Sequence, residues 1–355
     1  MRSPLNSRRE EIVAQQTTYY SDYLNLSQIL EAQTPLSSHP EEHLFIIVHQ
    51  IFELWFKQLN YDLSLLRKIM AETPISEEKI FHALGKVDRM NQILSLFGPQ
   101  LDVLETMTPM DFLEFRDLLR PASGFQSVQF RLFEVGLGLS LEARPTGSEK
   151  FFMGEMKKDD QEKLRITQPT PSLFHSLNAW LERMPFSSYS DNFQHFSFWQ
   201  EFKKSWKQFH EKSSQNSEEA TELEEELEKI LGKEQKTNKC EFSPLAKQQA
   251  LFIFLYYKDH YLLQSPYALL NGLMKLDTLL SSWRHRHTLL AQKMLGNRKG
   301  TGGSSGHEYL KKSTSQCRIF EELFSLSGLL IPKAYLPSLP REISNQLAMA
   351  MANLG

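Results

Sequence analysis

The chain has 355 residues, of which 41% are hydrophobic and 23% are charged, and its formal net charge is −3. This balance is typical of a globular protein with a large core, and the dispersed lysines and arginines exclude a nucleic-acid-binding footprint. The two cysteines, Cys240 and Cys317, exclude a disulfide framework and a cysteine-rich metal site. Because no signal peptide or membrane-length apolar run occurs, we expect a cytoplasmic protein without a membrane partner.

The first part of the chain predicts one short helix and one long one. Residues 1–16 are expected to be flexible, and residues 20–32 form a short amphipathic pattern with Tyr20 and Tyr23 near its start. A turn-like stretch over residues 34–40 then leads into a long helix, which is expected to run from Glu42 to about Glu72.

The long helix carries an apolar stripe whose members lie four or three residues apart: Phe45, His49, Phe52, Phe56, Leu59, Leu63 and Leu66. Apolar residues also cover its flanks, so we expect burial on most of its circumference. His49 and Glu53 are polar groups in this dry surrounding, and leaving either unpaired would cost a few kcal/mol. His49 is therefore either a core histidine bonded to a backbone carbonyl or the lining of a pocket, and its spacing leaves both interpretations open.

Two further helix starts follow. Ser76 is expected to begin a helix that continues towards Phe97 and ends at Gly98-Pro99. Thr108-Pro109 begins another, which is expected to stop at Pro121.

The helix after Thr108 places Arg116 four residues after Phe112, on the same side. Spacing alone favours a surface arginine paired with Asp117 or Glu114. The alternative is a guanidinium that reaches into a pocket to bind a carboxylate.

The middle of the chain changes composition over residues 186–245, and residues 217–236 are dominated by charge. Leu223, Leu227 and Ile230 still form a narrow apolar stripe, which predicts a solvated helical hairpin inserted into the chain. No strand-like alternation of any length occurs, so the predicted class is all-α, a long-helix bundle with a smaller inserted hairpin.

The last long helix is expected to begin at Ser265-Pro266 and to end at Gly296. Its stripe has the same spacing of four and three residues: Leu269, Leu273, Leu276, Leu280, Trp283, His287, Leu290 and Met294. His287 lies on this stripe, whereas the neighbouring His285 points away from it. A glycine-rich loop, GTGGSSG, follows at residues 300–306.

One histidine on the stripe of each long helix is more informative than either alone. A metal held only by protein needs three or four ligands, whereas a haem needs a single protein ligand and leaves its other face open.

Three long runs carry a resemblance to a known family: EEHLFIIVHQIFELWFKQL, LETMTPMDFLEFRDLLRPASGFQSVQFRLFE and SSWRHRHTLLAQKMLGNRKGTGGSSGHEYL. They resemble the signature blocks of tryptophan 2,3-dioxygenases, and SLFHSLNAWLERMPF and LSGLLIPKAYLP also fit. The resemblance covers residues 17–340 as one domain and leaves residues 341–355 as a tail. The charged segment at about residues 197–245 resembles the helical insertion of the longer, animal-type members.

The resemblance implies an all-helical domain that binds haem b non-covalently, ferrous in the active state, and that assembles as a homotetramer, a dimer of dimers. Its members add both atoms of O2 across the indole C2–C3 bond of L-tryptophan to give N-formyl-L-kynurenine, the first step of the kynurenine pathway. The alternatives are a paralogue that oxidises another indole and a haem or gas-binding protein without turnover. A retained amino-acid clamp argues against the last of these.

The resemblance also implies roles for individual residues. His287 is the axial haem ligand, His49 meets the indole N–H, and Phe45 forms the indole wall. Residues that bind the rest of the substrate are Phe112, Arg116, Ser123, Gly124 and Thr301, with Arg116 on the carboxylate. Tyr20 and Tyr23 complete the pocket of a neighbouring subunit.

Two stretches depart from the family pattern. Pro40-Glu41-Glu42 replaces an HDE sequence, and KDHYLLQSPY precedes the last long helix where an arginine is often found. Neither departure changes a pocket position.

Overall fold

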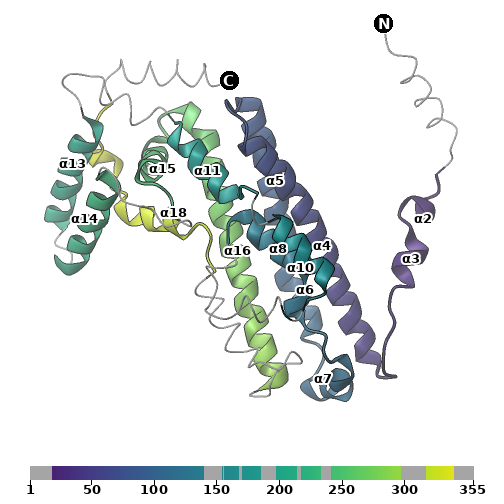
Figure 1. Ribbon diagram of the computed structural model, residues 1–355. Coiled ribbons are helices and arrows are strands. Elements are labelled where there is room, and N and C mark those ends of the chain that lie inside the picture. Colours follow the sequence, from purple (N-terminus) through teal and green to yellow (C-terminus); the bar gives the residue numbers. More distant parts are fainter. Residues whose placement is uncertain are drawn as a thin grey trace, which may run out of the picture.

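Three long helices form the centre of the molecule. The computed structural model describes residues 18–139, 154, 156–167, 170–184, 197–213, 217–232, 241–296 and 317–339. Helices α4 (Pro40–Met70), α5 (Glu77–Ser95) and α16 (Gln264–Leu295) lie alongside one another, with α5 in contact with both of the others (Figure 1). Helix α8 (Val128–Leu137) packs on α4. No strand occurs in the described residues, so the all-α prediction is confirmed.

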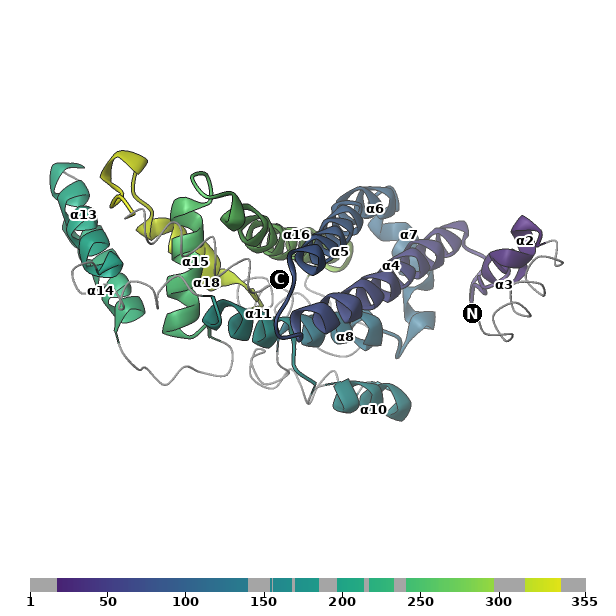
Figure 2. The ribbon, with the colours of Figure 1, turned by 90° about the horizontal axis from the view of Figure 1, so that it is seen from above.

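Shorter helices surround this centre. In chain order they are α2 (Tyr20–Tyr23), α3 (Leu26–Leu30), α6 (Phe97–Leu104), α7 (Pro109–Arg116), α10 (Lys158–Thr167), α11 (Leu173–Glu182), α13 (Phe198–Ser213), α14 (Ser217–Leu231), α15 (Pro244–Tyr256) and α18 (Glu321–Ser325). Turns of 3-10 helix are η1 (Asp117–Leu119), η2 (Gly124–Gln126), η3 (Tyr261–Leu263), η4 (Leu326–Leu329) and η5 (Lys333–Tyr335). Figure 2 places α13 and α14 at one end of the molecule and α2 and α3 at the other.

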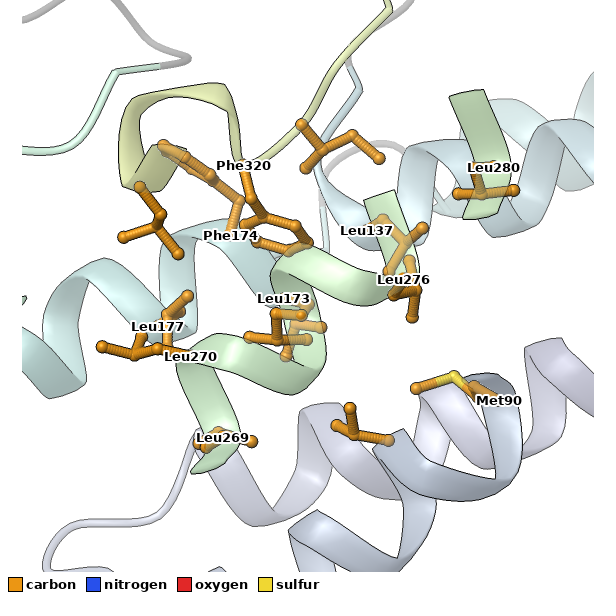
Figure 3. Packing of buried hydrophobic residues seen from close by; sticks show 14 of the residues in the cluster. Met90, Leu137, Leu173, Phe174, Leu177, Leu269, Leu270, Leu276, Leu280 and Phe320 are labelled. Atoms are coloured by element: carbon orange, nitrogen blue, oxygen red, sulfur yellow. The ribbon is translucent and has the colours of Figure 1, made fainter. Parts of the chain in front are cut away.

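The core lies where α16 meets its neighbours. Figure 3 shows apolar side chains from α5, α8, α11 and α16 packed together with Phe320, the residue before α18. The labelled side chains are Met90, Leu137, Leu173, Phe174, Leu177, Leu269, Leu270, Leu276, Leu280 and Phe320, and each is at most 4% exposed. Apolar burial of this extent is the main force that holds the long helices together.

The inserted hairpin is present as predicted. Lys203 of α13 pairs with Glu228 of α14, and Lys207 pairs with Glu224 at 2.5 Å, so the two helices run antiparallel. Leu227 is fully buried, which shows that the narrow apolar stripe of α14 faces the protein.

Helix boundaries differ from the sequence prediction in several places; α4 begins at Pro40, α7 ends at Arg116, and three further differences follow. The short N-terminal helix is broken into α2 and α3 because Asn25 adopts the left-handed conformation, with φ of 53°. Gly98-Pro99 lies in the first turn of α6 instead of ending a helix, and a proline is tolerated there because first-turn N–H groups have no helical acceptor. Helix α16 begins at Gln264, so Ser265 lies inside its first turn and does not cap it.

The prediction that the first long helix is buried on most of its circumference is only partly right. Its predicted stripe is buried from Phe52 onwards, but Leu54 and Tyr61 are 53% and 60% exposed on another face of α4. Periodicity identified the core face correctly, and the flank residues Leu44 and Trp55 pack partly buried against the core, whereas the face with Leu54 and Tyr61 is exposed.

Candidate functional site

The first half of α4 positions Phe45 and His49 one turn apart. The Nδ1 atom of His49 lies 2.7 Å from the carbonyl oxygen of Phe45. Because a carbonyl only accepts, Nδ1 carries the proton, and Nε2 of the neutral ring is left as an acceptor. Burial lowers the pKa of His49 from its ordinary value, and the bond to Phe45 opposes this only in part, so the ring is neutral at pH 7. The expected bond to a backbone carbonyl is present, but the ring is half-buried and its Nε2 is left as an acceptor, so a pocket-lining position stays open.

His287 lies near the C-terminal end of α16 in an aromatic surrounding. Its ring stacks on Trp283, one turn earlier, with centroids 5.8 Å apart and an angle of 11° between the planes. The Trp283 ring in turn packs against four phenylalanines at 5.1–6.0 Å: Phe52, Phe56, Phe97 and Phe130. His285 is exposed, as the stripe predicts. The aromatic cluster therefore fixes the direction in which His287 points.

The two histidines approach each other across the bundle. Burial, the larger cause, and the nearby His49 together lower the pKa of His287 to about 4. Both rings are half-buried, so each keeps some accessible surface although burial depresses its pKa. Two long helices thus present one neutral imidazole each to a shared region.

Helix α7 closes the end of this region. It begins with a capping box in which the Thr108 hydroxyl accepts from the Asp111 N–H and the Asp111 carboxylate accepts from the Thr108 N–H. The box orients α7 so that Phe112 packs on Phe45, with ring centroids 5.7 Å apart. Arg116 is only 5% exposed, and the neighbouring Asp117 pairs with Arg120 at 3.1 Å. The surface interpretation of Arg116 is therefore wrong.

The segment after α7 contains Ser123 and Gly124 and is organised by Gln126. The Gln126 side chain accepts from the Ser123 N–H at 3.2 Å and donates to the Pro121 carbonyl at 3.1 Å. Ser127, which caps α8, also bonds to the carboxyl of Glu53. Burial raises the pKa of Glu53, and the Ser127 hydroxyl opposes that rise. Glu53, singled out in the sequence as a buried polar group, therefore joins the His49 helix to this segment.

Not every predicted site residue comes together. Tyr20 and Tyr23 are 75% and 78% exposed in α2, away from the histidines of their own chain. Thr301 and the glycine-rich loop lie outside the described residues.

A buried ion network beside the site was missed by the sequence analysis. Glu134 of α8 pairs with Arg131 at 2.8 Å and with Arg284 of α16 at 2.7 Å. Arg284 also donates to the Cys317 carbonyl at 2.8 Å. A usable signal was available, because Arg131 and Glu134 are charged residues three apart in an otherwise apolar helix.

The fold and the site together define a class, the all-helical proteins that present a neutral imidazole from each of two long helices beside an aromatic wall and a buried guanidinium. A family model described as tryptophan 2,3-dioxygenase matches residues 7–330. The chain belongs to the tryptophan 2,3-dioxygenase family.

Relatives from distant organisms carry the same description. A tryptophan 2,3-dioxygenase of Dictyostelium discoideum is 37% identical, with 96% of this chain and 90% of the relative covered. Those of Bdellovibrio bacteriovorus and Aedes aegypti are each 36% identical over 93% of this chain and cover 98% and 90% of the relatives. The similarity spans nearly the full length of each protein.

Proposed function

We propose that this chain is a haem-dependent dioxygenase that converts L-tryptophan and O2 into N-formyl-L-kynurenine by cleaving the indole C2–C3 bond. The proposal rests on one feature of the molecule, the two neutral imidazoles of His49 and His287 that approach each other from α4 and α16. One is suited to bind iron, and the other to accept an indole N–H.

His287 is the proposed axial ligand of a non-covalent haem b, ferrous in the active state. The residues around it fit this group, because the low pKa keeps the imidazole in the neutral form that coordinates iron. The surrounding rings are apolar, and the Trp283 indole N–H is buried without a hydrogen-bond acceptor in the described part of the chain. When bound, the haem supplies the iron at which O2 is activated.

The substrate is held at both ends. Nε2 of His49 accepts the indole N–H, and Phe45 and Phe112 form the wall against which the ring packs. The Arg116 guanidinium binds the carboxylate through charge-assisted bonds, with Ser123, Gly124 and Thr301 completing the amino-acid end. His49 holds the N–H without removing its proton, because an indole N–H is a very weak acid. These contacts orient the indole for reaction.

The proposed assembly is a homotetramer, a dimer of dimers, in which Tyr20 and Tyr23 enter the pocket of a neighbouring copy. The exposure of both rings in the isolated chain supports this, since large apolar groups gathered at a surface mark interaction sites.

The proposed unit is a single domain over residues 17–340 that contains the insertion at about 197–245, followed by a tail over residues 341–355. In the part of the chain that the structure describes, no helix is long and apolar enough to cross a membrane. We propose a cytoplasmic location.

The test is product formation by the reduced protein. The purified chain, loaded with haem and reduced without oxygen, should show the Soret band of a five-coordinate ferrous haem. Addition of L-tryptophan and O2 should then yield N-formylkynurenine, one molecule for each O2 consumed. A reduced, haem-loaded protein that consumes no O2 with L-tryptophan would contradict the proposal.

A further inference from the structure

The carboxylate of Glu42, in the first turn of α4, holds the chain that precedes the helix. It accepts hydrogen bonds from the Leu36 N–H at 2.8 Å, the Ser37 N–H at 2.7 Å and the Ser37 hydroxyl at 2.5 Å. Glu42 is 1% exposed. We call these three residues the Glu42 clasp. Bonds to an ionised carboxylate are stronger than neutral ones, and the positive end of the helix dipole favours the charge further.

The clasp lies at the base of an arm, residues 18–35, that stands apart from the rest of the molecule (Figure 1 and Figure 2). No residue of α2 or α3 is buried. The base of the arm is also tied to α4 by Gln50, which donates to the Ala32 carbonyl at 3.1 Å and accepts from Gln33 at 2.7 Å. Two attachment points on one rigid helix determine the direction in which the arm leaves.

The segment between the arm and α4 also contacts the substrate side of the proposed site. His39, between the clasp and α4, caps that helix by accepting from the Glu41 N–H at 3.4 Å. Its Nε2 lies 3.8 Å from the Asp111 carboxylate, and its ring packs on Phe115 with centroids 6.1 Å apart. Asp111 belongs to the capping box of α7, the helix that carries Arg116. His39, which lies between Ser37 and Glu42 of the clasp, thus joins the base of the arm to the helix that carries the proposed carboxylate clamp.

We propose that Glu42 is a positioning residue that aims the arm at the pocket of a neighbouring copy of this chain. The inference rests on the proposed function, in which Tyr20 and Tyr23 complete that pocket. The occupant is a second copy because the arm exposes Tyr19, Tyr20, Tyr23 and Leu30 by 66–78% and leaves them away from the histidines of their own chain.

The physical reason is effective concentration. Residues 31–39 form no helix, so without the clasp they would let the arm sample many directions. The fraction of time that it spends in reach of a neighbour's pocket would fall accordingly. With the clasp intact, the arm is held in one direction before assembly, which reduces the entropy lost when it docks.

The test compares Glu42→Gln with Glu41→Gln in the haem-loaded full chain. Both substitutions remove one negative charge from the first turn of α4, but the Glu41 side chain takes no part in the clasp. We expect Glu42→Gln to weaken assembly, measured by sedimentation velocity, and to raise KM for L-tryptophan, each on the order of tenfold. The haem content and Soret band of Glu42→Gln should match those of the unsubstituted protein. Glu41→Gln should match the unsubstituted protein in assembly, KM, haem content and Soret band.

Mixing chains separates an effect through the arm from an effect on the chain's own pocket. An Arg116→Ala chain has an intact clasp and arm but an impaired pocket. A mixture of Arg116→Ala and Glu42→Gln chains should have a lower KM than Glu42→Gln alone, closer to that of the unsubstituted protein. The reason is that the arm of the Arg116→Ala chain can fill the pocket of the Glu42→Gln chain. The reference mixture is Arg116→Ala with Tyr23→Ala, which should recover activity for the same reason.

Each outcome tests either the role of Glu42 or the proposed assembly. If the reference mixture recovers activity and the Glu42→Gln mixture does not, the inference about Glu42 is wrong and the proposed assembly stands. If the reference mixture fails, or the unsubstituted protein is an active monomer, the proposed assembly is wrong. Should Glu42→Gln not fold, Ser37→Ala removes one donor of the clasp and should show the same changes to a smaller extent. Assembly and KM unchanged in Ser37→Ala would then overturn the inference.

Discussion

At the scale of single residues, the proposed site depends on two histidines whose lowered pKa values keep them neutral. The Phe45 carbonyl selects the tautomer of His49, so its free nitrogen is an acceptor. His287 is neutral because its surroundings are apolar and because His49 is close. Substitutions at these positions should therefore separate haem binding from substrate binding.

Replacing His287 tests the axial ligand. We expect His287→Ala to lose most of its haem, or the five-coordinate ferrous spectrum, because the proposed iron ligand is gone. His285→Ala is the matched control, since His285 is exposed two residues earlier on the same helix. Haem content is read from the Soret absorbance per protein chain. Equal loss in both variants would show that His287 is not the ligand.

Replacing Arg116 tests the carboxylate clamp. Charge-assisted bonds of about 1.5–3 kcal/mol each predict a loss of roughly ten- to a hundredfold in kcat/KM for L-tryptophan in Arg116→Ala. Arg116→Lys should remain clearly impaired because lysine lacks the planar fork. We expect both KM and kcat to change, since the clamp also orients the indole.

The control for Arg116 is a substrate without the carboxylate. Tryptamine should be almost indifferent to Arg116→Ala in the same kcat/KM measurement. If both substrates lose the same factor, Arg116 is not the carboxylate clamp.

At the scale of elements, α5 and α16 pack closely at a position where a side chain is missing. A Cβ at Gly272 of α16 would lie 2.7 Å from Cγ1 of Val87 on α5. Asn91 of α5 donates to the Gly272 carbonyl at 3.0 Å in the same place. Glycine at this position therefore sets the distance between the helix that carries His287 and its main partner.

A pair of glycine substitutions tests this contact. Gly272→Ala should lower the free energy of unfolding by about 1–3 kcal/mol, because the added methyl group forces two packed helices apart. Gly85→Ala, on α5 with open space around its Cα, should raise it by about 0.5–1 kcal/mol through helix propensity. Urea unfolding measures both. A Gly272→Ala protein as stable as Gly85→Ala would show that the crossing is not tight.

The first turn of α4 should make stability depend on pH through Glu42. Burial acts to raise the pKa of Glu42, but the hydrogen bonds from Ser37 and Leu36 outweigh it, so the folded pKa lies below the ordinary 4.5. A carboxyl whose pKa is lowered on folding contributes stability that is complete above 4.5 and is lost as pH falls through the lowered value.

The measurement is the difference in urea midpoint between the unsubstituted chain and Glu42→Gln. The comparison isolates Glu42 because the two proteins are otherwise identical. The difference in urea midpoint should be constant above pH 4.5 and should shrink as the pH falls below 4.5. A difference that grows on acidification would contradict the lowered pKa.

At the scale of the whole molecule, buried charges connect segments that are distant in the sequence. Glu134 of α8 binds Arg284 of α16, and Arg284 holds the Cys317 carbonyl, where the described chain resumes after residue 296. Asp277 of α16 accepts from the N–H groups of Ile319 and Phe320 at 3.2 and 3.3 Å. The helix of His287 thus anchors both α8 and the start of the C-terminal segment.

Removing Glu134 should destabilise the whole fold. Glu134→Ala leaves the guanidinium groups of Arg131 and Arg284 without their buried carboxylate, which should cost about 3–5 kcal/mol of unfolding free energy. Asp117→Ala removes one partner of an exposed pair and should have little effect. Urea unfolding of the two variants makes the comparison. A loss of similar size in both would mean that the buried network contributes no more than a surface pair.

The sequence by itself determined the helical class, the core faces and that His287, unlike the exposed His285, lies on the packed face of its helix. It could do so because helical periodicity is a local property, and each stripe shows which side of a helix is buried. It also located Glu53 and His49 as polar groups in need of partners. The long runs shared with a known family then predicted roles that spacing had left open, including that of Arg116.

Only the tertiary structure decided which faces meet. Periodicity does not say which helix covers a stripe, so neither the approach of His49 to His287 nor the burial of Arg116 could be derived from spacing. The tautomer of His49 depends on a backbone carbonyl at 2.7 Å, and the ion network depends on α8 lying beside α16. Residues 20–32 were expected to form one amphipathic helix, yet they form two, and Tyr20, Tyr23 and Leu30 are exposed. Contacts between distant segments decided all of these features, and the order of residues along one segment does not contain them.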